Sequence, residues 1–76
     1  MVNKWIERQN DKRFVMHMHW SSMRGWSWSV CLFTEDGEVI PGYEDHGRGC
    51  DVCDTWARMM EAADELERRA REAGKW

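Results

Sequence analysis

One cluster in the sequence has the residue types and spacing of a metal site. His46, Cys50 and Cys53 form the pattern His-x3-Cys-x2-Cys. Imidazole nitrogens and cysteine thiolates are the ligands that Zn²⁺ prefers in tetrahedral protein sites. A fourth ligand could come from one of three further residues, namely Cys31, His17 or His19. One hypothesis is therefore a zinc-stabilised module that binds nucleic acid or protein.

The same Cys-x2-Cys pair opens a predicted helix, an arrangement that resembles a thioredoxin-type redox site. A helix N-terminus lowers the pKa of a cysteine thiol. Asp51 and Asp54 act in the opposite direction, and the strand-helix-strand unit of that fold is missing. No phosphate-binding loop, nucleophile elbow or helical His-Glu-x-x-His motif is present either. We expect a protein that is not an enzyme.

A second set of candidate residues is acidic. Between Glu35 and Asp54 the sequence has seven acidic side chains and a single basic one, Arg48. Tyrosine is a frequent anchor of protein interfaces, and Tyr43 lies within this segment. The residues that we expect to bind a partner are Glu35, Asp36, Glu38, Tyr43, Glu44 and Asp45. Concentrated negative charge favours a partner with a basic surface.

Length and composition predict one small domain over residues 1–76, with a formal net charge of −3. Residues 1–34 have five basic and two acidic side chains, whereas residues 35–76 have six basic and twelve acidic ones. The basic N-terminal third carries Trp5 and Trp20, but direct nucleic-acid binding is less expected because the pI is acidic, about 5.5. No segment is apolar enough to span a bilayer, and the N-terminus lacks the apolar core of a signal peptide. We expect a cytoplasmic protein, with a homodimer as one possible state.

The elements that would position these residues centre on a hairpin over residues 13–34. Apolar and polar residues alternate in two runs around a loop at residues 21–25. If Trp20 pairs with Trp26, every apolar residue of the even-numbered set falls on one face, and this condition usually sets the register. His17 and His19 then lie on the other, polar face.

The flanking segments complete the expected fold. Residues 2–9 fit a strand or a short helix, and we favour the strand, which would pair Trp5 with Met16. Asp36-Gly37 predicts a turn into a strand that places either Val39 or Ile40 in the core, and Pro41 marks that strand as an edge or its end. Three glycines predict a loop over residues 42–49.

A helix is predicted over residues 51–73, with Asp51 as its N-cap and Gly74 as its stop. Its apolar stripe has helical spacing and consists of Val52, Trp56, Met59, Met60, Ala63, Leu66 and Ala70. The predicted fold class is α+β: an antiparallel meander of three to four strands, with this C-terminal amphipathic helix on one face.

The order of three strands and a helix is similar to that of double-stranded-RNA-binding domains. It is similar also to HicB-type antitoxins, whose partial RNase H fold ends its sheet with an acidic helix. The local sequence feature that resembles this family is Pro41-Gly42 before the helix. The lysine-rich helix start of the RNA-binding family is missing, since residues 50–55 are acidic. An antitoxin-like domain is thus an alternative. We favour a small acidic protein-binding domain that acts as an inhibitor or adaptor of a basic, nucleic-acid-binding host protein. Phage-type anti-CRISPR inhibitors are an example of this class.

Overall fold

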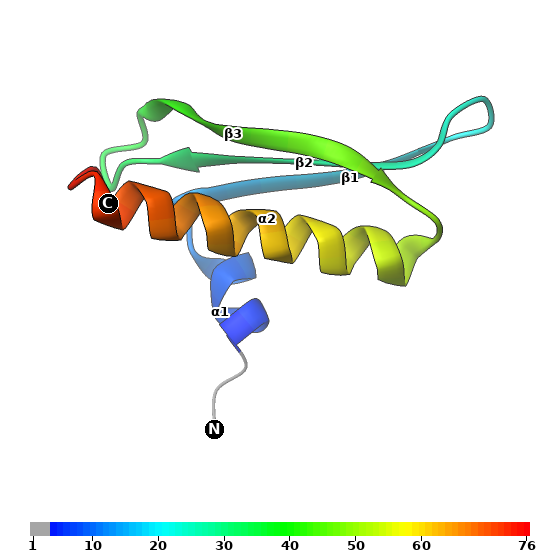
Figure 1. Cartoon of the computed structure of the whole chain (residues 1–76), viewed down its shortest axis with the longest axis horizontal. Helices are drawn as coiled ribbons and strands as arrows, with labels where there is room; N and C mark the ends of the chain where they lie inside the picture. Colours follow the sequence, from blue (N-terminus) through cyan, green and yellow to red (C-terminus); the bar gives the residue numbers. More distant parts are fainter. Residues whose placement is uncertain (1–3) are drawn as a thin grey trace.

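The computed structural model describes residues 4–76. Two helices and three strands follow one another as α1 (Lys4–Asn10), β1 (Phe14–Ser21), β2 (Gly25–Phe33), β3 (Val39–Gly49) and α2 (Val52–Glu72). The strands form one antiparallel sheet in the order β1-β2-β3, and α2 lies along one face of it (Figure 1). The predicted α+β meander with a C-terminal helix is confirmed.

The register of the hairpin is also confirmed. Trp20 pairs with Trp26, Met18 with Trp28 and so on along the strand, with the full set of pairs ending at Phe14 opposite Leu32. The face beneath α2 therefore receives Phe14, Trp28, Val30 and Leu32, all of which are buried. The opposite face of the hairpin is polar and uncovered, because no second layer lies on that side (Figure 1).

Helix α2 has the predicted boundaries and caps. The Asp51 carboxylate accepts a hydrogen bond from Asp54 N–H, and Gly74 has a positive φ of 70° that lets Lys75 N–H reach Ala70 O. The buried stripe differs from the prediction at one turn, since Val52 is exposed and Thr55 is fully buried. Gly49 lies directly against Thr55, so the end of β3 packs on the first turn of α2 rather than on Val52.

The N-terminal segment is a helix, and the predicted strand is wrong for the described part of it, Lys4–Asn10; residues 2–3 lie outside the described residues. The reason lies in the tertiary contacts of this segment. Arg8 is buried between α1 and α2, where it forms ion pairs with Asp64 at 2.5 Å and with Glu67 at 3.4 Å. Its guanidinium also lies 4.9 Å from the centre of the Phe14 ring. These partners on α2 are about sixty residues away in sequence, so the local pattern cannot reveal them.

Residues 42–49 form most of strand β3, so the predicted loop is also wrong. Two of its three glycines serve close packing, and the third, Gly42, has a positive φ of 86°. A Cβ at Gly47 would come within 2.7 Å of the Trp28 ring, and one at Gly49 within 2.7 Å of Thr55 Cα. Glycine within a strand often marks such a close approach rather than a turn. Of the two predicted starts for this strand, the one with Ile40 in the core is confirmed, since Ile40 is buried and Val39 is 50% exposed.

Candidate functional site

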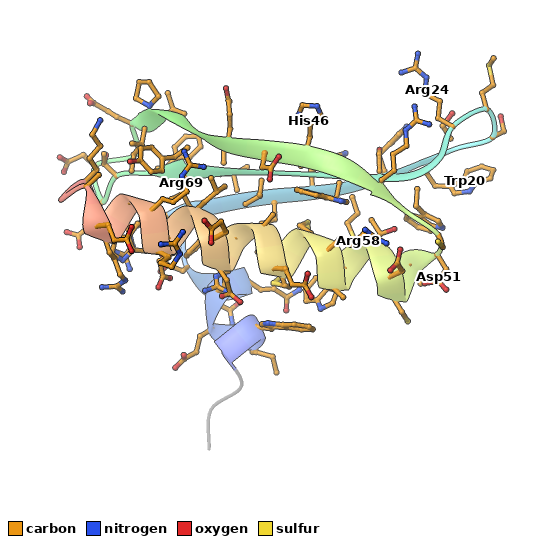
Figure 2. All side chains as sticks on the ribbon, in the orientation of Figure 1. Trp20, Arg24, His46, Asp51, Arg58 and Arg69 are labelled. Atoms are coloured by element: carbon orange, nitrogen blue, oxygen red, sulfur yellow. The ribbon has the colours of Figure 1, made fainter. Side chains whose placement is uncertain are left out.

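The uncovered outer face of the sheet carries the candidate residues, and it is built from rows of three side chains. Each row joins one residue of β1, β2 and β3. The rows are Val15–Cys31–Glu44, His17–Ser29–His46 and His19–Ser27–Arg48. Figure 2 shows His46 pointing away from α2, and Arg24 at the β1–β2 loop beyond the last row. The outer face is therefore basic towards that loop and acidic towards the β2–β3 turn.

A bulge in β3 gathers the acidic residues at one end of the sheet. Phe33 pairs with Val39, whereas Cys31, only two residues back on β2, pairs with Glu44. Residues 40–43 thus stand opposite Leu32 alone, which gives β3 three extra residues. Glu44 therefore lies nearer to the turn that carries Glu35, Asp36 and Glu38 than unbroken pairing would place it. We call this region the acidic end, and it consists of Glu35, Asp36, Glu38, Glu44 and Asp45.

The five carboxylates of the acidic end are all exposed. No Lys or Arg nitrogen of residues 5–76 lies within 4.0 Å of any of them. The acids of α2 behave differently, because most are paired: Asp54 with Arg58, Glu65 and Glu72 with Arg68, and Glu67 with Arg8 and Arg71. The five carboxylates of the acidic end therefore form no close ion pair within residues 5–76, although Arg13 and Lys75 line the same pocket as Glu35.

An apolar centre adjoins the acidic end on the outer face. Phe33 and Val39 are cross-strand partners there, and Val15 and Cys31 form the next pair. Val15 and Val39 are each about half exposed, at 49% and 50%. Burial, together with the Glu44 charge, raises the pKa of the Cys31 thiol. Cys31 therefore stays a neutral thiol at physiological pH and contributes as a small apolar side chain.

Tyr43 and Asp45 lie on the other side of β3. The Tyr43 ring is half-buried against the core, with Arg69 Cζ 5.4 Å and Lys75 Nζ 5.8 Å from its centre. Asp45 pairs with Val30 and accepts a hydrogen bond from the backbone N–H of His46. Tyr43 thus holds the C-terminal part of α2 against β3, and its predicted role as an interface anchor stays a prediction.

Asp51 and Asp54 are separated from the acidic end by the length of β3. The segment 42–49 is a strand, so the start of α2 and the β2–β3 turn lie at opposite ends of β3. Asp51 caps α2, while Asp54 accepts hydrogen bonds from Cys50 N–H at 2.8 Å and from Arg58 Nε at 2.9 Å. These bonds, the one from Cys50 first, lower the pKa of Asp54. Both acids therefore have a structural role at the helix start.

The predicted zinc ligands belong to three different segments. His46 belongs to the middle row of the outer face, Cys50 follows the end of β3, and Cys53 is exposed on the first turn of α2. Within residues 4–76 no three His, Cys, Asp or Glu side chains are grouped so that they could hold a metal ion. Zinc binding through His46, Cys50 and Cys53 stays a prediction, and it would require the end of β3 to rearrange.

A basic hollow lies on the outer face near the β1–β2 loop, and the sequence analysis missed it. It measures about 860 Å³ and contains no carboxylate among its lining residues, which include His17, His19, Arg24, His46 and Arg48. His46 and Arg48 were assigned to a loop, so they were not expected beside the two hairpin histidines. The alternation of Glu44, His46 and Arg48 at every second position was the available indication of a strand.

The chain was compared with protein-family models, with curated proteins and with solved structures, and none of the three comparisons found a match. The similarities to RNA-binding domains and to antitoxins therefore rest on the order of the elements alone. Among the described residues no helix is long and apolar enough to cross a membrane. The surface chemistry of the sheet is what supports a function for this α+β domain.

Proposed function

We propose that this domain binds another protein, acting as an inhibitor or adaptor, and that a basic surface of the partner docks on the acidic end. The observation that carries the proposal is a set of five exposed carboxylates in the β2–β3 turn and the adjoining part of β3, none of which forms a close ion pair within residues 5–76. Glu35, Asp36 and Glu38 lie in the turn that joins the apolar pair Phe33 and Val39. Glu44 lies on the same outer face as that pair, whereas Asp45 lies on the other side of β3.

The negative charge of the acidic end gives the physical reason for a basic partner. Like charges held close together cost stability through mutual repulsion. The same chain pairs most acids of α2 with arginines at 3.4 Å or less, for example Glu67 with Arg71 and Arg8, so unpaired acids are not a general feature of its surface. Lysines and arginines of a partner would supply the missing counter-ions and steer its approach.

The apolar centre provides the part of the interface that excludes water. Protein interfaces commonly have an apolar core surrounded by a polar rim. Val39, Phe33 and Val15 form such a core, and Glu35, Glu38 and Glu44 lie around it. A nucleic-acid-binding groove is one basic surface that a row of carboxylates would fill, and the domain would then inhibit by occupying it. Phage-type inhibitors of host nucleic-acid enzymes act in this way.

The basic hollow favours a second candidate function, the binding of a nucleic-acid strand. Arg24 and Arg48 form no ion pair with another described residue, and three histidines stand beside them. Nucleic-acid binding gets much of its affinity from neutralised phosphates. The acidic pI weighs against it, so we rank this function below protein binding.

A paired charge reversal tests the proposal. The variant Glu38→Lys/Glu44→Lys changes the acidic end, and Glu61→Lys adds the same kind of charge change on the exposed side of α2. Circular dichroism first shows that both variants are folded. Immobilised wild-type and variant proteins then capture partners from an extract of the source cells, and mass spectrometry identifies them.

We expect a basic protein that binds the wild type and Glu61→Lys and is lost from the double variant. Its affinity for the wild type should fall as salt is added, since salt screens charge. A partner that binds the double variant equally well, with no salt dependence, would place the interface elsewhere. Capture of nucleic acid that Arg24→Ala/Arg48→Ala abolishes would favour the second candidate instead.

A further inference from the structure

Strand β1 is an edge of the sheet, and within residues 4–76 the backbone groups on its outer side have no partner strand. Phe33 N–H donates to Arg13 O at 2.7 Å, which sets the phase of the ladder between β1 and β2. In an antiparallel pair, alternate residues direct their N–H and C=O groups to opposite sides. The backbone groups of Met16, Met18 and Trp20 therefore point to the open edge.

Nothing in the sequence of β1 blocks this edge. Natural proteins protect open edges with charged side chains, proline, bulges or short strands. The segment FVMHMHWS contains no proline, no glycine and no Lys, Arg, Asp or Glu over eight residues. β3, the other edge, has Pro41, a bulge and three charged residues, Glu44, Asp45 and Arg48.

The apolar surface next to β1 is also left incomplete by α2. The helix packs mainly over β2 and β3 and touches β1 much less. A groove of about 440 Å³ lies between β1 and α2, and its lining includes Phe14, Met16, Met18, Trp56 and Met59. Trp20 at the end of β1 is 56% exposed (Figure 2). An occupant of this edge must therefore be both a strand and apolar on the α2 side.

We propose that the occupant is a second copy of this chain, with the two β1 strands pairing antiparallel about a two-fold axis at His17. Met16 then lies opposite Met18 of the second copy, and Phe14 opposite Trp20 of the second copy. Even-numbered residues meet even-numbered residues, so apolar side chains of both copies share the α2 side. Because the strand carries no permanent charge, its own copy brings no like-charge repulsion into the pairing. The result is a continuous six-stranded sheet, with both α2 helices on the same face.

This dimer does not rest on the proposed function. The acidic end of each copy belongs to the β2–β3 turn and to β3, whereas the dimer uses the backbone edge of β1, and Val15 is the residue of β1 that also belongs to the apolar centre. A two-fold dimer would present two acidic ends on one sheet, so the same surface could engage two sites on a partner. The variants that test the two proposals are therefore different.

The test measures the mass of the protein by sedimentation equilibrium from micromolar to millimolar concentration. We expect the wild type to approach twice the chain mass of 9.1 kDa. Trp20→Lys should weaken dimerisation by roughly a hundredfold, since an unpaired ammonium would lie in the apolar contact. Met18→Pro should do the same by removing an N–H that only the second copy uses, because proline is tolerated on an open edge.

Val39→Lys is the matched control, because it adds the same charge to the other edge at a similarly exposed valine. It should leave the dimer intact and weaken partner binding, and Trp20→Lys should do the reverse. Hydrogen exchange identifies the surface: the amides of Met16, Met18 and Trp20 should be protected in the dimer and exchange rapidly in Trp20→Lys. A wild type that stays monomeric throughout, or a dimer whose β1 amides exchange rapidly, would overturn the proposal.

Discussion

β1 and β3 are both edges of one sheet, yet their sequences differ in how they pack and how they meet solvent. β3 approaches the core so closely that Gly47 and Gly49 have no room for a side chain, and its outer edge carries a bulge and charges. β1 has no glycine and no permanent charge, and α2 covers it only in part. β3 is therefore built into the monomer, whereas β1 keeps an edge that can still pair.

The largest expected effect contrasts a tryptophan beneath β3 with one at the end of β1. Trp28 is 9% exposed and packs under Gly47, so Trp28→Ala should lower the free energy of unfolding by about 3–5 kcal/mol. Trp20→Ala should cost less than about 1 kcal/mol in dilute solution, because its side chain is mostly exposed already. Urea denaturation followed by circular dichroism measures both. Equal losses would mean that β1 is packed as tightly as β3.

The second prediction concerns the close contact between β3 and α2. Gly49→Ala would push a methyl group into Thr55, and we expect a loss of about 1–3 kcal/mol in unfolding free energy from overpacking. His17→Val, on the exposed face of β1, should change stability by less than about 0.5 kcal/mol. Thermal melts of the two variants give the comparison. An unchanged melting temperature for Gly49→Ala would show that the start of α2 is free to shift.

The third prediction tests the turn that leads into β1. Side-chain hydrogen bonds from Arg13 hold the pKa of Asp11 below its ordinary value. A carboxyl group whose pKa is lower in the folded chain than in the unfolded one stabilises the fold fully above about pH 5, and that contribution is lost as pH falls through the folded value. Because Asp11 is partly exposed, the contribution should stay below about 1 kcal/mol.

Asp11→Asn is the corresponding variant. It should be slightly less stable than the wild type at pH 7, and the two unfolding curves should converge towards pH 2, where both side chains are neutral. Urea titrations at a series of pH values measure the difference. A gap that stays constant with pH would mean that the loss comes from packing and not from the carboxylate charge.

The smallest expected effect lies just beyond β3, at the two exposed cysteines. The structure keeps Cys50 and Cys53 apart from a third ligand, so Cys50→Ser/Cys53→Ser should leave the melting temperature unchanged. Elemental analysis of the purified wild type is the decisive measurement. One equivalent of zinc, with a lower melting temperature after chelation, would support the hypothesis of a zinc-stabilised module.

Local alternation in the sequence was enough to predict the β1–β2 hairpin in full register. Apolar residues recur at every second position from Phe14 to Trp20 and from Trp26 to Leu32, and a shift by one residue would expose all of them. The same holds for α2, whose cap at Asp51 and stop at Gly74 act within a few residues of the helix ends. The residues that determine these elements therefore lie within the elements or directly beside them.

Only the tertiary structure decided the identity of α1 and β3 and the layout of the surface. Arg8 has its partners on α2, and Gly47 and Gly49 of β3 are required by Trp28 and Thr55 from other elements. The bulge that brings Glu44 to the β2–β3 turn likewise depends on pairing with Cys31 and Phe33. Such contacts join residues that are distant in the chain. The local sequence therefore does not distinguish a glycine that leaves room for an aromatic ring from a glycine that makes a turn.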